Sequence, residues 1–168
     1  LTKKRLEYIG SRNAGLDGLI LMVSKYENLG YQIAHYNTRY RGCGPYELRC
    51  QPKYTLTSLA EIEMSKIVAF DRLHFPAPRD TFLNCWLKQK DGAGFGVLIE
   101  DKLCGYGYIR PCRSGFKIGP LFADNQDIAE EIFLKLIDFA GDKEFYIDCP
   151  ETNLNAKALA FEYDLETI

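Results

Sequence analysis

The spacing of apolar and polar residues changes several times along this chain of 168 residues, and each change marks an expected element. In the first part the pattern predicts four short elements: the end of a helix over 1–11, a buried strand over 16–21, a short helix over 24–29 and a strand over 31–39. Glycine and proline punctuate the next stretch, so 42–53 is expected to be a linker.

After this linker the pattern becomes regular and alternates between strand and helix periods. It predicts a strand over 55–59, a helix over 61–74, and a second helix with the apolar stripe Phe82, Leu83, Trp86 and Leu87. Three runs joined by tight turns predict an antiparallel meander over 95–99, 103–109 and 116–122. A strong amphipathic helix capped by Asp127 and ended by Gly141 comes next. The remaining pattern predicts a strand over 145–149, a helix over 155–161 and a strand that starts at Leu165.

The composition is that of an ordinary globular protein. Apolar residues make up 46% and charged residues 26%, so a chain of this length can bury a core without a metal or disulfide staple. The formal net charge is −2 and no basic block occurs, which argues against nucleic acid as a partner. No apolar run reaches the roughly 18 residues of a membrane helix, and no signal-peptide pattern opens the chain. We therefore expect a cytoplasmic protein without a membrane partner.

Six cysteines occur, and none of them forms a Cys-x-x-Cys pair. Reduced cysteines of a cytosolic protein are the simplest interpretation. A zinc site needs two close ligand pairs, and Cys43 and Cys50 are too loosely spaced to suggest one. The sequence therefore predicts no metal site.

The order of the elements after residue 54, together with three motifs, resembles the second module of a tandem GNAT N-acetyltransferase family. The motifs are Phe75-Pro76-Ala77-Pro78-Arg79, Ile109-Arg110-Pro111-Cys112-Arg113, and the run from Lys117 to Asp124. Residues 8–18 resemble the end of the first module of that family. The resemblance implies a C-terminal remnant of a first GNAT module over 1–41, a linker over 42–53, and a second GNAT-like module over 54–168 that is truncated at its last strands.

This resemblance also implies a fold and an activity. The fold would be of α+β or α/β class, a GNAT-like mixed, mostly antiparallel twisted sheet flanked by helices. The parent protein would be an acyl-CoA-dependent N-acyltransferase that uses acetyl-CoA and a small-molecule amine acceptor. In the family the cofactor lies where two central strands splay apart, and a glycine-rich loop at a helix N-terminus holds the diphosphate on backbone N–H groups. A tyrosine can protonate the departing thiolate.

Tyr26 is the candidate for that tyrosine in the first module, because Tyr26 to Tyr31 resembles the end of a GNAT module. The alternative is that the Tyr26 ring only packs beside a strand. The glycine-rich loop of the first module is expected upstream of Leu1. Arg41-Gly42-Cys43-Gly44 imitates such a loop, but Pro45 removes a donor and no helical stripe follows, so it is assigned to the linker.

The second module is expected to form the strand-to-helix junction over 120–129 but to lack the means of holding a diphosphate. Asp124 and Gln126 stand where the family has glycines, and Ala123 stands where arginine or glutamine is usual. Side chains at these positions obstruct close approach of a ligand to the backbone, and Asp124 adds negative charge. Ala160 occupies the tyrosine position. The resemblance therefore implies that this module does not bind acetyl-CoA in the usual way.

Other candidate chemistry is sparse. Arg110, Arg113 and Lys117 cluster around one hairpin and could contact an anionic ligand; the alternative is a solvated turn. His35 and His74 lack a neighbouring nucleophile and are expected in core or surface roles. A second function class thus stays open beside the acyltransferase, namely a catalytically silent GNAT-like module that binds a small ligand or a protein.

Overall fold

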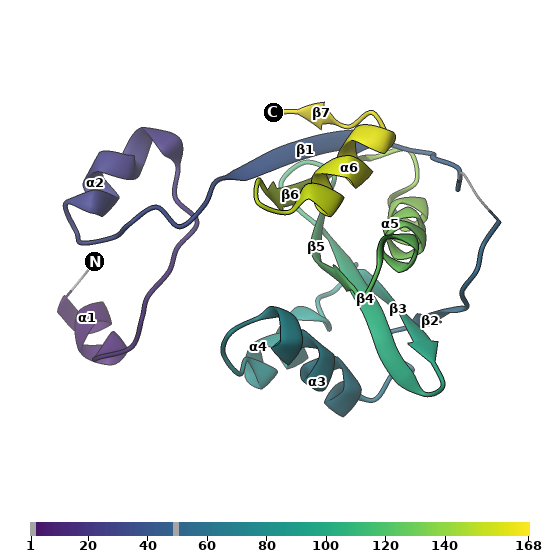
Figure 1. Ribbon diagram of the computed structural model, residues 1–168, viewed down its shortest axis with the longest axis horizontal. Helices are drawn as coiled ribbons and strands as arrows, with labels where there is room; N and C mark the ends of the chain where they lie inside the picture. The colour runs from purple at the N-terminus through teal and green to yellow at the C-terminus, as the bar shows by residue number, and fades with distance from the viewer. Residues whose placement is uncertain (1–2, 49–50) are drawn as a thin grey trace. The chain divides into compact units, whose positions relative to one another are not determined.

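The computed structural model describes residues 3–48 and 51–168, and the chain divides into two compact units (Figure 1). The small unit comprises residues 1–36 and the large unit residues 37–168. Parts of the predicted first helix and of the predicted linker, residues 1–2 and 49–50, lie outside the described residues.

The small unit contains three short helical elements: α1 (Lys3–Ile9), η1 (Ile20–Met22) and α2 (Val23–Glu27). The buried strand predicted over 16–21 is wrong, because this segment is unpaired and then enters η1. Its apolar side chains are exposed: Leu19 at 71%, Ile20 at 76% and Leu21 at 94%. A short apolar run by itself does not distinguish a strand from a segment that needs another partner to cover it.

The large unit is built on a seven-stranded sheet with the order β2-β3-β4-β5-β6-β1-β7. The strands are β1 (Asn37–Cys43), β2 (Leu56–Ser58), β3 (Ala93–Ile99), β4 (Lys102–Pro111), β5 (Phe116–Ala123), β6 (Glu144–Pro150) and β7 (Glu166–Thr167). All neighbours pair antiparallel except β5 and β6, which are parallel. This confirms the mixed, mostly antiparallel sheet expected from the sequence.

Strand β1 lies further along the chain than the strand predicted over 31–39. It pairs with β6 from Asn37 opposite Pro150 to Cys43 opposite Glu144, so Gly42 and Cys43 belong to the sheet although the predicted linker included them. A Cβ atom on Gly42 would come within 2.4 Å of the Phe145 ring, which explains why glycine suits this paired position. The assignment of modules to 1–41 and 54–168 stays a prediction.

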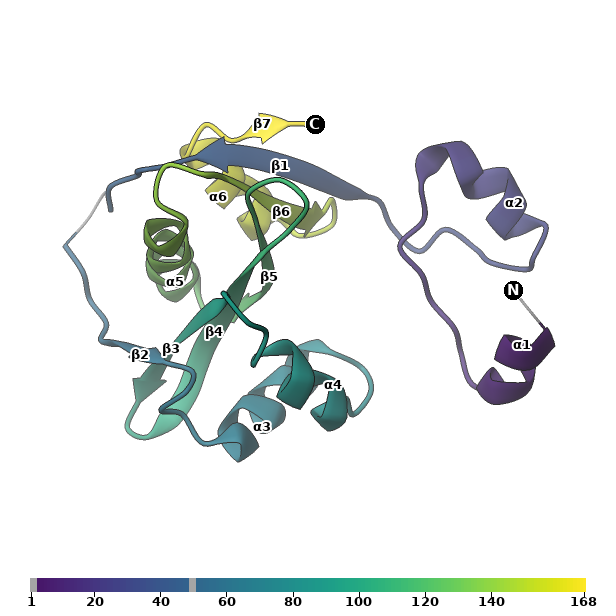
Figure 2. The same ribbon diagram turned by 180° about the vertical axis from the view of Figure 1, so that it is seen from behind.

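Helices cover both faces of the sheet (Figures 1 and 2). They are α3 (Met64–His74), α4 (Asp80–Trp86), α5 (Gln126–Ala140) and α6 (Leu154–Glu162). Helices α5 and α6 lie on one face, and α3 and α4 lie on the other. Asn125 rather than Asp127 caps α5, because the Asn125 side chain accepts from the N–H of Ile128 at 2.9 Å. Gly141 ends this helix with φ 63°, as predicted.

A Gly-Tyr-Gly-Tyr run in β4 separates the two layers. Because side chains alternate across a strand, Gly105 and Gly107 face α5 while Tyr106 and Tyr108 face α3. Cβ atoms on the two glycines would come within 2.6 Å of Ile128 and 2.8 Å of Ile132, so their absence lets α5 pack closely on the sheet. Tyr106 and Tyr108 belong to the core on the α3 side.

A buried ion pair joins α3 to the start of α4. Asp71 is only 2% exposed and accepts hydrogen bonds from the Arg79 guanidinium, with Nε at 2.7 Å, and from the Tyr106 hydroxyl. Burial by itself would raise the pKa of the Asp71 carboxyl, but the bonds from Arg79 and Tyr106 outweigh it and hold that pKa below its ordinary value. The Arg79 guanidinium also lies over the Phe75 ring at 4.0 Å.

We expect Asp71→Ala to lower the free energy of unfolding at pH 7 by about 3 kcal/mol, because it leaves the Arg79 charge unpaired in a mostly buried place. The contribution of Asp71 is present above the pKa of about 3.9 of an unfolded aspartate, and it is lost as pH falls through the lower folded pKa. Urea denaturation at pH 7 and below pH 4 measures both effects, and the difference between variant and parent should shrink at the lower pH.

Asp138→Ala is the matched control, because Asp138 also lies in a helix and pairs with Lys135 at 2.8 Å, but on the surface. It should leave the free energy of unfolding nearly unchanged. Equal losses in the two variants would contradict the role assigned to the buried pair.

Candidate functional site: the cleft between β5 and β6

The two central parallel strands separate after a short paired stretch. Strands β5 and β6 pair only from Phe116 opposite Phe145 to Ile118 opposite Ile147. Pro120 has no N–H to donate to a neighbouring strand. The carbonyl of Gly119 accepts instead from the indole Nε1–H of Trp86 at 2.9 Å. Both residues are thereby withdrawn from the β5–β6 ladder, and a cleft opens beyond Ile118.

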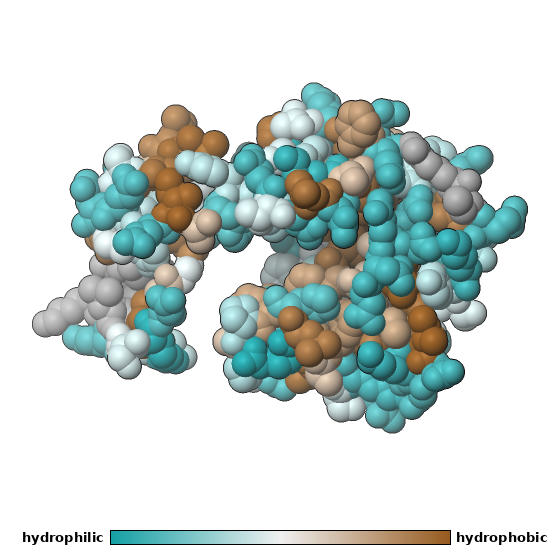
Figure 3. Space-filling model, viewed as in Figure 1, coloured by the Kyte–Doolittle hydropathy of each residue, from teal (hydrophilic) through white to brown (hydrophobic). Residues whose placement is uncertain are grey.

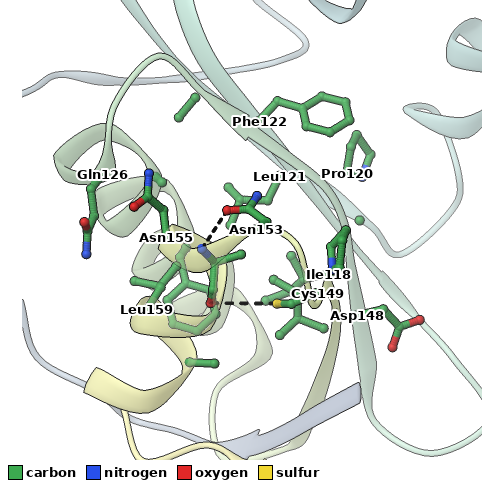
Figure 4. A pocket seen from close by; sticks show the side chains of 18 of the residues that line it. Ile118, Pro120, Leu121, Phe122, Gln126, Asp148, Cys149, Asn153, Asn155 and Leu159 are labelled. Carbon is green, nitrogen blue, oxygen red and sulfur yellow. Dashed lines mark hydrogen bonds between the residues drawn. The ribbon is translucent and has the colours of Figure 1, made fainter. Parts of the chain in front are cut away.

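The cleft has a volume of about 410 Å³, which lies in the range of small-molecule sites. Its deeper wall is apolar and is formed by Ile118, Leu121, Phe133, Ile147, Leu159 and Ala160. Its rim carries carboxamides from the first residues of α5 and α6, and Figure 4 shows Gln126, Asn153 and Asn155 on this side. The site therefore combines an apolar interior with a polar rim, which also carries the exposed carboxylate of Asp124.

The predicted strand-to-helix junction over 120–129 is confirmed, because β5 ends at Ala123 and α5 begins at Gln126 beside the cleft. Two backbone N–H groups at this junction already have hydrogen-bond partners within the chain. The Asn125 cap takes the N–H of Ile128, and the N–H of Asp124 is bonded to the Cys104 carbonyl at 2.8 Å. A diphosphate on this helix N-terminus would have to displace the Asn125 cap.

The start of α6 has the same arrangement. The Asn153 side-chain oxygen accepts from the N–H of Ala156 at 3.0 Å, as the dashed line in Figure 4 shows. This bond leaves the Asn153 amide N–H groups as donors, since a carboxamide has both an acceptor and donors. Two helices thus present N-terminal ends to the cleft, and each carries a neutral asparagine cap.

The residues assigned to the cleft wall in the described part of the chain include no lysine or arginine. One carboxylate of the cleft wall, Asp148, accepts hydrogen bonds from the Arg39 guanidinium, with Nε at 2.7 Å, and from the Lys117 ammonium group. Burial alone would raise the pKa of Asp148, but the bonds from Arg39 and Lys117 outweigh it and lower that pKa. Asp148 therefore stays ionised and paired at neutral pH, and the described residues of the cleft wall offer no lysine or arginine to an anionic ligand.

Cys149 is the thiol in the cleft wall, and it is 2% exposed. Burial, followed by the nearby charge of Asp148, raises the pKa of the Cys149 thiol to about 11. At neutral pH the sulfur is protonated, and a thiol is a poor nucleophile compared with a thiolate. The geometry does not favour an acyl-cysteine intermediate at this position.

Ala160 lies in the cleft wall and is 2% exposed, so the position that the resemblance gives to the tyrosine carries no acid. Tyr163 follows it in sequence but is buried in the core, where its hydroxyl bonds to Glu130. Tyr163 is not part of the cleft wall. This arrangement supplies no tyrosine to protonate a leaving thiolate in this cleft.

The three basic residues predicted around one hairpin have different surroundings in the structure. Arg110 and Lys117 are paired across β4 and β5, but Lys117 binds Asp148 while the Arg110 guanidinium lies over the Trp86 ring at 4.7 Å. Arg113 is exposed in the turn. Contact of these residues with an anion stays a prediction.

Tyr26 lies in α2 of the small unit, where its ring packs edge-on against Tyr31 with the centroids 6.4 Å apart. The alternative to a catalytic role is packing beside a strand, but Tyr31 lies outside the strands of the sheet. The role of Tyr26 as a general acid stays a prediction.

His74 is exposed, as a surface role predicts, and it also lines the cleft. Its ring stacks on the Phe122 ring with the centroids 4.8 Å apart, and its centroid also lies 4.8 Å from that of the Phe70 ring. No sequence signal pairs a helix C-terminal histidine with a phenylalanine of a later strand. Only the packing of α3 against the sheet brings these rings together.

Some classes of site do not occur in the described part of the chain. Residues 3–48 and 51–168 contain no group of His, Cys, Asp or Glu residues arranged to hold a metal ion. The described cysteines Cys43, Cys85, Cys104, Cys112 and Cys149 are free, while Cys50 lies outside these ranges. None of the helices in the same ranges has the length and apolar character needed to cross a bilayer.

Comparison with known proteins identifies relatives that share this architecture. The family model described as an acetyltransferase (GNAT) domain matches residues 67–168. The chain is 24% identical over 167 residues to the holothin acyltransferase of Pseudoalteromonas sp. (strain SANK 73390), a match that covers 96% of this chain and 56% of that protein. The chain thus spans about half the length of this curated relative.

Solved structures show the same fold. A crystal structure of a Pyrococcus horikoshii protein assigned as an acetyltransferase has a TM-score of 0.74 at 23% identity, and the match covers 98% of this chain and 54% of that one. A GNAT-family acetyltransferase from Colwellia psychrerythraea has a TM-score of 0.60 at 14% identity, covering 85% of this chain and 58% of that one.

We expect Cys149 to react with iodoacetamide at pH 8 at least about tenfold more slowly than Cys43 or Cys85, because burial both shields its sulfur and keeps it protonated. Peptide mass spectrometry over a time course measures the rates. In urea the cysteines should react at similar rates, which controls for local sequence effects. Fast labelling of Cys149 in the folded chain would contradict its assigned burial in the cleft wall.

Proposed function

This chain belongs to the GNAT acetyltransferase family, and we propose that it is part of an acyl-CoA-dependent N-acyltransferase that transfers an acetyl group to a small-molecule amine. The family supports acyl transfer, and the curated relative named as an acyltransferase covers nearly the whole chain. The splayed strands and the junction at α5 support the same activity class, since the family holds its cofactor in such a cleft.

The large unit, in this proposal, does not hold acetyl-CoA in the usual way. One observation carries this point: Asn125 and Asp124 occupy the junction where the diphosphate would lie, and the N–H of Ile128 is already bonded to the Asn125 side chain. Anions at a helix N-terminus gain from unpaired donors and from the helix dipole. Here the donor is used, and the Asp124 carboxylate would repel phosphate.

The exposed apolar residues of the small unit support a separate first module as the place of the cofactor. The apolar side chains Leu19, Ile20 and Leu21 are exposed, and Figure 3 shows apolar residues at the surface of the small unit. Such a cluster is typical of a surface that another part of a protein covers. We propose that residues 1–41 complete a first GNAT module, with Tyr26 as its general acid, and that the large unit supports that module.

A second candidate function is a catalytically silent module that binds a small ligand in the cleft. Ala160 at the tyrosine position favours it, because the cleft then has an apolar interior but no acid for a leaving thiolate. In the first proposal the chain is part of an acyltransferase whose cofactor lies in another module. In the second proposal the chain takes no part in acyl transfer. They agree that this cleft does not seat the CoA diphosphate.

Calorimetric titration of this chain with acetyl-CoA tests the proposal. We expect no saturable binding up to millimolar cofactor, because the Asn125 cap takes the N–H of Ile128, Asp124 adds a carboxylate, and the described residues of the cleft wall include no lysine or arginine. The double variant Asp124→Gly with Asn125→Gly removes the charge and the cap, and it should strengthen binding by about tenfold or more.

Asp101→Gly is the matched control, because it also removes one carboxylate from a turn, and Asp101 already has the positive φ of 66° that glycine accepts. It should not change the titration. Micromolar binding of acetyl-CoA by the unchanged chain would show that the cleft is an ordinary cofactor site and would overturn this part of the proposal.

A further inference from the structure

We infer that Arg110 and the aromatic surface of α4 beside it form a binding site for an aromatic carboxylate. This site is separate from the proposed function, because Arg110, Trp86 and Phe82 are not among the residues of the cleft wall. Three observations support it: a guanidinium without a carboxylate partner, an excess of positive charge around that guanidinium, and exposed aromatic rings at its side.

Arg110 is a partly exposed arginine that takes part in none of the ion pairs among residues 3–48 and 51–168. Its Nη1–H donates to the neighbouring Pro111 carbonyl at 3.2 Å, and its Nε atom is buried without a hydrogen-bond partner. Buried donors without an acceptor are rare, because they lose their hydration and gain nothing in return. The guanidinium therefore gains if it turns toward a ligand with two oxygens, which can accept from Nε and Nη2 as a fork.

The sheet around Arg110 carries more positive than negative charge. Lys117 lies directly opposite Arg110 across β4 and β5, and like charges in opposite positions repel each other. The carboxylate that neutralises Lys117 is Asp148, which also accepts from the Arg39 guanidinium. In the described part of the chain these three cations thus have one carboxylate partner, and no ion pair joins Arg110 to it. An anion beside Arg110 reduces the repulsion.

Trp86 and Phe82 give the site a flat apolar surface. The Arg110 guanidinium lies over the Trp86 ring at 4.7 Å, and the Phe82 ring stacks on the Trp86 ring with the centroids 5.0 Å apart and the planes at 25°. The indole is held in place by its Nε1–H bond to the Gly119 carbonyl. Phe82 is 42% exposed and Trp86 is partly exposed, so the ring of a ligand can lie against them.

These features together select a singly charged carboxylate with an aromatic body. The planar fork of a guanidinium matches the two oxygens of a carboxylate, and the exposed rings favour an aromatic body over a flexible aliphatic one. Phosphate esters also bind arginine, but their second charge needs another cation, and Lys117 is already bonded to Asp148.

Trp86 is the single tryptophan of the chain, so its fluorescence reports on this site directly. Four probes are titrated into the full chain: hydrocinnamate, its uncharged amide hydrocinnamamide, the aliphatic heptanoate, and phenyl phosphate. We expect hydrocinnamate to change the fluorescence saturably with a Kd on the order of 1 mM, as suits a small ligand on an open surface. The amide should bind at least about tenfold more weakly and heptanoate at least about threefold more weakly.

Each other outcome of these titrations counts against the site. Hydrocinnamamide binding as tight as that of hydrocinnamate would show that no ion pair forms and would overturn the inference. Tighter binding of phenyl phosphate would overturn the assignment to carboxylates. The absence of saturable hydrocinnamate binding in both fluorescence and calorimetry would overturn the site as a whole.

Arg110→Gln removes the proposed anchor and should weaken hydrocinnamate binding at least about tenfold. Arg113→Gln is the matched control, because Arg113 lies in the same hairpin and is exposed in the turn. It removes the same charge from a solvated position and should change the affinity by less than about twofold. Equal effects of the two variants would show that overall charge attracts the probe, and would overturn the role of Arg110.

Phe82→Ala tests the aromatic surface at an exposed position and keeps the site testable if Arg110→Gln does not fold. We expect hydrocinnamate to lose its advantage over heptanoate in this variant, because the stacking surface is gone. Circular dichroism checks the fold of each variant. An unchanged preference for hydrocinnamate in folded Phe82→Ala would overturn the aromatic part of the assignment.

Discussion

The cleft depends on the point at which β5 leaves β6. Pro120 cannot donate a hydrogen bond, and the carbonyl of Gly119 accepts from Trp86 at 2.9 Å instead of from a neighbouring strand. Pairing therefore ends at Ile118 opposite Ile147. If this stretch of β5 were paired, the two strands would remain side by side, and the space beneath the first residues of α5 and α6 would close.

The position of Trp86 is itself set by the other face of the sheet. Trp86 ends α4, and Arg79 at the start of α4 is held by the buried Asp71 of α3. Tyr106 of β4 donates to the same carboxylate. This network joins two helices and a central strand, and Trp86 of the second helix donates to the Gly119 carbonyl. Removing one partner from such a network leaves an uncompensated buried charge, which strongly destabilises the fold.

Electrostatics then decide what the cleft can accept. The fold retains the strand-to-helix junction with which its family holds a diphosphate, but Asn125 uses a helix donor internally and Asp124 adds a negative charge. Arg39 and Lys117 lie near the cleft, yet both are directed to Asp148. The shape is therefore that of a cofactor cleft, but the charges at the junction do not favour a diphosphate.

The sequence by itself determined the meander, the junction over 120–129 and α5, because alternation, tight turns and helical apolar spacing are local signals. The sequence also showed that Asp124 and Gln126 stand where the family has the glycines of its diphosphate loop. It failed for 16–21, where an apolar run lacks a strand partner, and it chose Asp127 as the cap although Asn125 reaches the N–H of Ile128. Only the tertiary structure decided the insertion of β1 between β6 and β7, the place of His74 in the cleft and the pairing of Asp148. Each of these depends on contacts between residues far apart in the chain, which a local pattern does not encode.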